Sequence, residues 1–317
     1  MVLKVKDLFV NIVKENSVFK VLTQVNFSLK EKEILCIVGE SGCGKTVLGY
    51  SILGLLPSYF KVKGEILFKG KDILSLSPKE LEKIRGKEIS MVFQDPMVSL
   101  NPLFKIGDQI KEVLDVHDLF DPKERKRKVI ELLAEVGLPA NYEFYNRYPH
   151  QLSGGQKQRV MIAMAVACNP HLLIADEPTT ALDVTVQAQI VQLFKKIKEI
   201  HNSSIIYITH DLHLVKHIGH RVLIMYLGCI VEEGLIEDIF KTPLHPYTQG
   251  LLEAIPSIYK KNRPLKSIPG TVPSLDNRPK GCVFHTRCPK SFKRCKEAFP
   301  ELKKVEKGHF VRCFLYE

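Results

Sequence analysis

Apolar and polar residues alternate at the start of the chain, which is the pattern of strands with one buried face. The alternation runs from Leu3 to Phe9 and from Val21 to Leu29, and the segment from Gly64 to Phe68 continues it. Antiparallel sheets commonly bury one face and leave the other polar. These segments therefore predict an antiparallel β layer.

Three other short runs are apolar at nearly every position, namely Glu33 to Val38, His171 to Ala175 and Ser204 to Ile208. Such runs are typical of parallel strands that helices cover on both faces. Between the second and the third run, Val184 to His201 has the 3.6-residue period of an amphipathic helix. The predicted fold class is therefore α/β, with a parallel core sheet.

The middle of the chain has no strand-like run. Its apolar positions repeat with helical spacing from Ile110 to Val116 and from Pro122 to Val136. We therefore expect a helical subdomain at about residues 95–160, inserted into a large domain that spans residues 1–256. No internal repeat is visible, so this domain is expected once.

Beyond Leu251 the chain changes to Pro, Lys and Cys with little apolar periodicity. We expect a boundary near Pro256 and a small, irregular C-terminal extension at residues 257–317. The extension holds fifteen Lys or Arg against five Asp or Glu, so it carries ten of the eleven net positive charges. A basic face on the main domain, and with it a nucleic-acid partner, is not expected.

The sequence shows neither a membrane span nor an export signal. Its apolar runs fall short of the ~18–20 residues that cross a bilayer, and the N-terminus lacks the apolar core of a signal peptide. Any membrane work is therefore expected to be done through partner subunits. The eight irregularly spaced cysteines are not expected to form a disulfide framework.

A glycine-rich loop joins the first buried run to an expected helix from Val47 to Leu55. The glycines let backbone N–H groups wrap around a polyphosphate, and the helix N-terminus adds partial positive charge. Lys45 is expected to reach the β and γ phosphates, and the Thr46 hydroxyl to bind Mg²⁺. The loop has the G-x-x-x-x-G-K-[ST] spacing, with the residues Gly39, Glu40, Ser41, Gly42, Cys43, Gly44, Lys45 and Thr46.

Two adjacent carboxylates, Asp176 and Glu177, end the second buried run. We expect Asp176 to hold Mg²⁺, directly or through water. Glu177 is expected to act as the general base that polarises the attacking water, an effect worth ~10²–10⁴ in rate. Asp-Glu-Pro is also a plausible helix start, but the phosphate loop favours the catalytic interpretation.

Four further motifs occur in the order found in the ATP-binding-cassette (ABC) ATPases, which the first 250 residues resemble. They are the Q-loop Met91 to Pro96, the signature Leu152 to Gln156, the D-loop Ala181 to Asp183 and the switch segment Ile208 to Asp211. The resemblance implies a phosphate-loop core sheet with an antiparallel β subdomain and an inserted helical subdomain. It also implies that ATP, with Mg²⁺, is sandwiched between two cassettes, and that hydrolysis releases them.

The resemblance assigns roles to individual residues. Gln94 is expected to contact the metal or the attacking water, and His210 to sense the γ-phosphate. Phe19 is our choice for the aromatic side chain that stacks on adenine, with Phe9 as the alternative. The signature residues expected to close over ATP held by the opposite cassette are Ser153, Gly154, Gly155 and Gln156, and Asp183 of the D-loop is expected to belong to the nucleotide site.

The last third of the chain resembles one group within this family. His245 to Leu252, Ile268 to Pro273 and Gly281 to Pro289 look like the C-terminal region of oligopeptide and dipeptide importer ATPases. The resemblance implies a heterodimer with a sister ATPase, two transmembrane subunits and an external solute-binding protein. The chain would then act at the cytoplasmic face of the cell membrane. For His245 to Tyr247, a proline-rich turn remains the alternative.

Four late cysteines are spaced C-x5-C-x6-C-x17-C, at Cys282, Cys288, Cys295 and Cys313. Structural zinc prefers tight pairs, whereas this looser spacing with a Cys-Pro step fits a [4Fe-4S] cluster better. Resemblance to cluster-bearing dipeptide-importer ATPases points the same way. Zinc, free thiols or adventitious disulfides remain open, and His285 could replace one ligand.

Other functions compete with peptide import. A soluble ABC ATPase acting on nucleic acid or ribosomes would explain an iron–sulfur site, but such ribosome-recycling proteins carry two cassettes per chain. Importers of oligosaccharides or metal chelates share the same architecture. A binding module with an inactive ATPase site is disfavoured because Lys45, Glu177 and His210 are all present.

Overall fold

The computed structural model describes residues 1–14, 17–180, 182–255, 267–306 and 308–317. Ala181 of the D-loop segment and Pro256, near which the domain boundary is expected, lie outside the described residues.

The N-terminal strands form a four-stranded antiparallel sheet, as their alternation predicts. Leu3 pairs with Leu29 on one side and with Phe68 on the other, so the first strand lies inside the sheet. In spatial order the strands are β2 (Ser17–Leu29), β1 (Leu3–Lys14), β4 (Phe60–Phe68) and β5 (Lys71–Asp72).

The apolar runs form the centre of an eight-stranded sheet. The strands from β9 to β6 pair in parallel, and β10, β12 and β11 continue the sheet antiparallel at one edge. The spatial order is β11 (Lys303–Glu306), β12 (His309–Val311), β10 (Cys229–Leu235), β9 (Arg221–Tyr226), β3 (Ile34–Val38), β8 (Ser204–Thr209), β7 (Leu172–Asp176) and β6 (Ile89–Val92).

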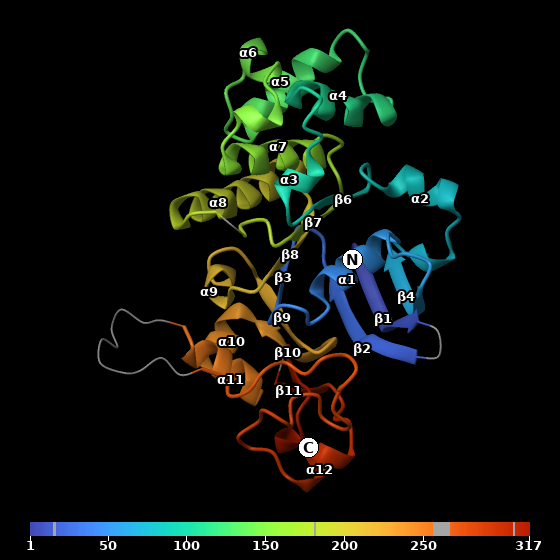
Figure 1. The fold of residues 1–317 in the computed structure, drawn as a ribbon, viewed down its shortest axis with the longest axis vertical. Coiled ribbons are helices and arrows are strands. Elements are labelled where there is room, and N and C mark those ends of the chain that lie inside the picture. Colours follow the sequence, from blue (N-terminus) through green and yellow to red (C-terminus); the bar gives the residue numbers. More distant parts are fainter. Residues whose placement is uncertain (15–16, 181, 256–266, 307) are drawn as a thin grey trace.

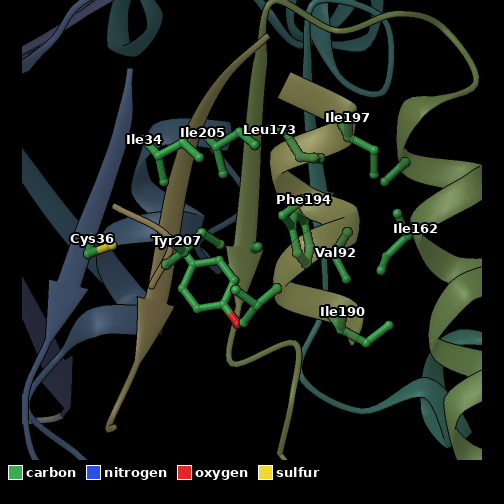
Figure 2. Packing of buried hydrophobic residues seen from close by; sticks show 14 of the residues in the cluster. Ile34, Cys36, Val92, Ile162, Leu173, Ile190, Phe194, Ile197, Ile205 and Tyr207 are labelled. Carbon is green, nitrogen blue, oxygen red and sulfur yellow. The ribbon is translucent and has the colours of Figure 1, made fainter. Parts of the chain in front are cut away.

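This sheet is buried on both faces, which explains why its strands are apolar throughout. On β3, Ile34 and Cys36 belong to one buried cluster, whereas Leu35 and Ile37 belong to the other. The first cluster includes side chains from α7 and α8 (Figure 2). The second includes the antiparallel sheet and α1. The central strands are thus positioned by packing from two sides.

The helices α3 to α7 lie between β6 and β7 in the chain and gather at one end of the molecule (Figure 1). The helices are α1 (Lys45–Leu53), α2 (Pro78–Ile84), α3 (Pro96–Ser99), α4 (Ile106–Val116), α5 (Arg125–Glu135), α6 (Tyr142–Tyr145), α7 (Gly154–Val166), α8 (Val184–His201), α9 (Leu212–Val215), α10 (Ile236–Lys241), α11 (Pro246–Glu253) and α12 (Lys293–Glu297). Short 3₁₀ helices occur at Ile73–Ser75, Pro149–Gln151 and Phe314–Tyr316. In the described part of the chain, no helix is both long enough and apolar enough to span a membrane.

The C-terminal residues form few regular elements and pack against the main domain. They end at the pole opposite α4 to α6 (Figure 1) and add β12 to the edge of the core sheet, where Glu232 and Glu233 pair with Val311 and Phe310. Their few apolar side chains, Phe284 and Phe314 among them, are buried in the first core cluster. A segment too polar to form its own core is therefore stabilised by the core of the main domain.

Candidate functional site

The phosphate loop lies between β3 and α1, at the carboxyl end of a central strand. Gly44 caps the helix with φ of 97°, and Gly42 has φ of 78°, so both need the freedom of glycine. At Gly39 the requirement is steric, because there is no room for a side chain. A Cβ there would lie 2.2 Å from the backbone oxygen of Met225 on β9. The loop thus follows the edge of the sheet too closely for a larger residue.

Lys45 lies inside this loop and is 4% exposed. Its Nζ donates to the carbonyl oxygens of Gly39, at 2.8 Å, and Glu40, at 3.2 Å. The same atom lies 3.5 Å from Oε1 of Glu177. The structure therefore brings Lys45 of the loop and the proposed base Glu177 together, although they lie far apart in the sequence.

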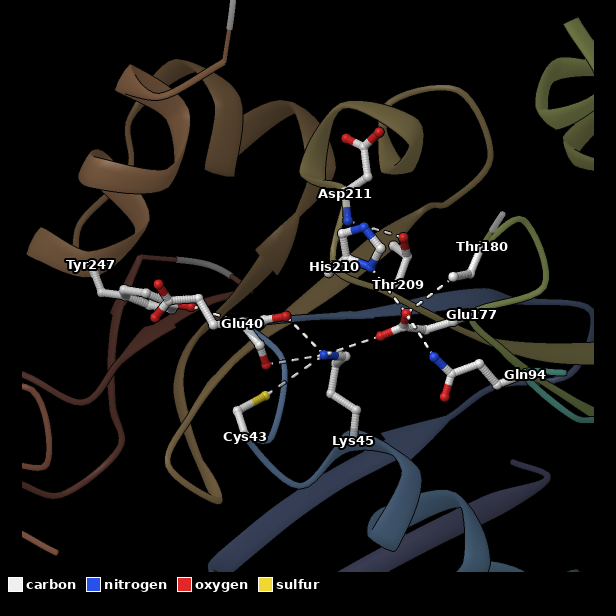
Figure 3. Close-up of polar contacts among 11 residues, drawn as sticks. Glu40, Cys43, Lys45, Gln94, Glu177, Thr180, Thr209, His210, Asp211 and Tyr247 are labelled. Carbon is white, nitrogen blue, oxygen red and sulfur yellow. Dashed lines mark hydrogen bonds and ion pairs between the residues drawn. The ribbon is translucent and has the colours of Figure 1, made fainter. Parts of the chain in front are cut away.

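Glu177 follows β7 in the left-handed conformation, with φ of 45°. The turn directs its carboxylate towards residues from three other segments (Figure 3). Its Oε2 lies 3.0 Å from Nδ1 of His210, and it accepts hydrogen bonds from Oγ1 of Thr180 at 3.1 Å and from Nε2 of Gln94 at 3.5 Å. Because of this conformation, the carboxylates of the adjacent residues Asp176 and Glu177 face different environments.

The neighbours of Glu177 favour its ionised form. Burial raises the pKa of this carboxyl, but the hydrogen bond with His210 and the positive charge of Lys45 together outweigh it. The resulting pKa lies below the usual range of a glutamate. The side chain is therefore ionised at neutral pH, as a general base must be.

Asp176 is 1% exposed, and burial raises its pKa to about 6, although a hydrogen bond from Thr46 and the charge of Lys45 act in the opposite direction. Its Oδ1 has no hydrogen-bond partner in the structure. A buried carboxylate oxygen without a partner is unfavourable, and a divalent cation would satisfy it. Asp176 and Thr46 therefore fit the Mg²⁺ ligand set. Gln94 is exposed and donates to Oε2 of Glu177.

The signature residues form a separate group at the start of α7, in which Ser153 and Gly154 are exposed and Leu152 is buried. Ser153 and Gln156 make a capping box, in which each side chain accepts a hydrogen bond from the other's backbone N–H. A Cβ added to Gly154 would lie 3.7 Å from Cδ2 of Leu182 in the D-loop segment, and Asp183 caps α8 by accepting the N–H of Val186. Between the described residues of this group and the phosphate loop, the structure has no hydrogen bond or ion pair.

Of the two candidate aromatic residues, Phe19 lies nearer to the loop. It is half-buried on β2, two residues before Val21, whose carbonyl oxygen lies 3.4 Å from the position of a Cβ on Gly44. Phe9 lies on β1, one strand further from the loop.

Residues 22–180, which contain both the phosphate loop and the signature, match the family model described as ABC transporter. The oligopeptide transport ATP-binding protein OppD of Bacillus subtilis is 49% identical over 317 residues, covering 99% of this chain and 88% of that protein. The chain belongs to the ABC transporter family.

Other comparisons agree with this assignment. The dipeptide transport ATP-binding protein DppD of Escherichia coli is 45% identical, over 98% of this chain and 95% of that protein. A dimeric ATP-binding cassette, solved in a post-hydrolysis state with ADP and phosphate, superposes with a TM-score of 0.65. It is 32% identical and covers 74% of this chain and 98% of its own. The predicted fold class of an ABC cassette is thereby confirmed.

The C-terminal part of this ABC protein has a match of its own. Residues 231–295 match the model described as the C-terminal region of oligopeptide/dipeptide transporters. This region holds two residues that we did not assign to the site from the sequence, Tyr247 and Arg287. Both contact Glu40 of the phosphate loop. Both lie in segments that carry the family resemblance, Tyr247 in His245 to Leu252 and Arg287 in Gly281 to Pro289. No spacing signal links Arg287 to a residue 247 positions earlier.

The four late cysteines gather in this ABC protein's C-terminal extension as free thiols. Each is close enough to the others to interact electrostatically. Burial raises the pKa of Cys282 to about 12 and also raises those of Cys288 and Cys313. His285 instead contacts the carbonyl oxygen of Cys282 through Nδ1. Within the described residues, no three His, Cys, Asp or Glu side chains are placed to hold a metal ion.

Proposed function

We propose that this chain is the ATP-hydrolysing subunit of an importer for dipeptides or oligopeptides. The observation that carries the proposal is the position of Glu177 beside Lys45, His210 and Gln94 at the mouth of the phosphate loop. The match of residues 231–295 and the names of the relatives support peptides as the transported class.

The geometry supports a division of labour during hydrolysis. The loop N–H groups and Lys45 would bind the β and γ phosphates. Mg²⁺, held by Thr46 and Asp176 with Gln94 beside Glu177, would neutralise charge on the phosphates. Glu177 is ionised and oriented by Thr180 and His210, so it can take a proton from water at the γ-phosphate. Its distance of 3.0 Å from His210 ties the base to the residue expected to sense that phosphate.

A second cassette is needed to complete this site. Ser153, Gly154 and Asp183 are exposed, and within the described residues no hydrogen bond or ion pair joins them to the chain's own phosphate loop. Their helix N-terminus suits the γ-phosphate bound by an opposite cassette. A sister ATPase that forms a heterodimer with this chain is the partner we propose.

An exposed apolar surface beside Gln94 supports docking of a membrane subunit. Met97, Val98, Leu103 and Phe104 follow Gln94 closely in the sequence and are 66%, 83%, 80% and 56% exposed; exposed apolar side chains of this size are typical of interaction surfaces. A neighbouring pocket of about 340 Å³ is lined by Phe93 and Met161 among others. We place the contact with two transmembrane subunits here, at the cytoplasmic face of the membrane, with an external binding protein delivering the solute.

For the cysteines we propose a [4Fe-4S] cluster, which would supply four metal–thiolate bonds that tie the extension together. Three sulfurs accept backbone N–H groups from the residue two positions further on: Cys282 from Phe284, Cys288 from Lys290 and Cys313 from Leu315. Such hydrogen bonds favour thiolates. The cysteines do not converge as ligands of a single ion, and a cluster needs less convergence because each thiolate binds a different iron.

Metal analysis of the anaerobically purified chain tests the cluster. About four irons and four acid-labile sulfides per chain are expected. Zinc at one equivalent would replace the cluster by a structural zinc site, and the absence of any metal would leave four thiols. The Cys168→Ser variant, outside the group, is the control and should keep the metal.

Uptake by cells that lack the gene for this chain tests the transport function. Loss of labelled dipeptide or oligopeptide uptake, restored by the wild type but not by Glu177→Gln, is expected. Loss of oligosaccharide or metal-chelate uptake with normal peptide uptake would correct the substrate class. Normal uptake of every solute, together with salt-sensitive RNA binding by the chain, would contradict the importer proposal.

A further inference from the structure

A side chain from the C-terminal extension reaches the phosphate loop. Arg287 lies between Cys282 and Cys288 in the sequence and is 7% exposed. Its Nη1 donates to Oε2 of Glu40 at 2.7 Å, and its Nη2 donates to Oε1 at 3.1 Å. A bidentate arginine–carboxylate pair of this kind fixes orientation as well as distance. The second residue of the phosphate loop is therefore bound directly by the extension.

Arg287 is itself held in place by its surroundings. Its Nε donates to the carbonyl oxygen of Pro269 at 2.9 Å, and its guanidinium lies over the ring of Tyr226, 5.8 Å from the centroid. Phe284 packs against Tyr226 and Tyr247, with ring centroids 5.2 and 5.3 Å apart. These contacts leave the guanidinium little freedom to move away from Glu40.

The backbone of Glu40 is held from two sides. Its N–H donates to the hydroxyl of Tyr247 at 3.1 Å, while its carbonyl oxygen accepts from Lys45 at 3.2 Å. Figure 3 shows Glu40 between these two side chains. The beginning of the loop is thus fixed between the catalytic lysine and residues outside the ABC motifs.

We propose that Arg287 is a positioning residue for nucleotide binding, which acts through Glu40. It holds the start of the phosphate loop in the conformation that receives ATP, because its two hydrogen bonds fix the side chain of Glu40, the second residue of that loop. The inference rests on the proposed ATPase function and extends it, because the C-terminal extension becomes part of the nucleotide site.

Equilibrium titration of the full chain with a fluorescent ATP analogue tests this role. Arg287→Ala should weaken ATP-analogue binding by about ten-fold. Arg287→Lys keeps the positive charge but loses the bidentate hydrogen bonds, and should weaken binding less than Arg287→Ala does. Adding Glu40→Gln to Arg287→Ala should cause no further loss, because the two residues act as one unit. Lys290→Ala is the matched control. Lys290 also joins the extension to the core, through Gln249 at 3.2 Å, without touching the loop.

Hydrogen exchange at residues 39–46 gives a second measurement, which should be faster in Arg287→Ala and unchanged in Lys290→Ala. If Arg287→Ala disrupts the extension, seen as faster proteolysis, the comparison of Arg287→Lys with Glu40→Gln decides instead, and both should weaken binding. Wild-type affinity in Arg287→Ala, additive losses in the double variant, or an equal loss in Lys290→Ala would each overturn the inference. A wild-type chain that binds no ATP would instead reject the ATPase function on which the inference depends.

Discussion

Two neighbouring carboxylates at the end of β7 have opposite electrostatic environments. Burial raises the pKa of Asp176 to about 6, whereas His210 and Lys45 outweigh burial and lower the pKa of Glu177. The left-handed backbone at Glu177 separates them, because its side chain leaves the sheet while Asp176 remains within it. A metal ligand and a base can therefore come from consecutive residues.

Replacing Glu177 by glutamine tests the role of the base. Glu177→Gln should retain ATP binding and lower the rate of phosphate release by ~10²–10⁴, because an amide cannot accept the proton. The measurement is steady-state phosphate release together with retention of an ATP-bound pair with the proposed sister subunit. Glu65→Gln, which removes an exposed pair with Lys6 on the antiparallel sheet, is the control and should hydrolyse ATP normally. Undiminished release in Glu177→Gln would remove this residue from the role.

At the scale of the element, helix ends place much of the proposed ATP site. The loop glycines lead into α1, Ser153 and Gln156 cap α7, and Asp183 caps α8. An N-cap stabilises its helix and exposes N–H groups at the same end, so structural and functional roles coincide. Substitutions at these positions must therefore be chosen so that an effect on helix stability can be told apart from an effect on ATP binding or hydrolysis.

Asp183 offers such a separation. Asp183→Ala should destabilise the chain by about 1 kcal/mol, because the hydrogen bond from the N–H of Val186 is lost. Asp183→Asn keeps the cap and should unfold like the wild type in a denaturant titration. If the residue also contacts the opposite cassette, the asparagine variant should still lower ATPase activity of the assembled pair. Equal stability of all three proteins would contradict the capping role.

At the scale of the whole molecule, the extension and the cassette share one core. Phe284 packs among His245, Tyr226 and Tyr247, and β12 extends the main sheet. Buried polar groups also join the extension to the cassette. Glu232 accepts hydrogen bonds from the N–H groups of Leu244 and His245 and from Nε2 of His309. Unfolding of the extension would therefore expose part of the cassette core.

His245, which is buried in this contact between the extension and the cassette, makes the free energy of unfolding sensitive to acid. Burial lowers the pKa of His245 to about 4, against ~6.5 for an unfolded histidine. Its Nδ1 accepts the N–H of Tyr247, so the folded chain holds the neutral form. As the pH falls below about 6.5, His245 becomes protonated in the unfolded chain. In the folded chain it stays neutral until about pH 4. The resulting stability is complete above this range and decreases as the pH falls through it.

Denaturant titrations at pH 7 and pH 5 test the effect. The wild type should lose about 2 kcal/mol more over this interval than His245→Asn, which keeps a capping side chain but does not titrate. Glu232 and His309 remain in both proteins, so their contribution cancels in the comparison. The same pH dependence in both proteins would show that His245 is not the group responsible.

The sequence alone determined the fold class and the order of the ABC motifs, because their signals are local. Strands buried on both faces must be apolar throughout, and a loop that wraps phosphate must contain glycines at set positions. The runs at Glu33 to Val38 and Ser204 to Ile208 therefore predicted β3 and β8, and the segment from Val184 to His201 predicted α8.

Only the tertiary structure decided how distant segments meet. Gln94, Glu177 and His210 come together because parallel strands bring their carboxyl ends to one edge of the sheet. The sequence indicated an irregular, separate extension because its few apolar residues could not form a core. Their burial against the cassette, and the pairing of Arg287 with Glu40 across 247 positions, depend on surfaces that exist only after the chain has folded.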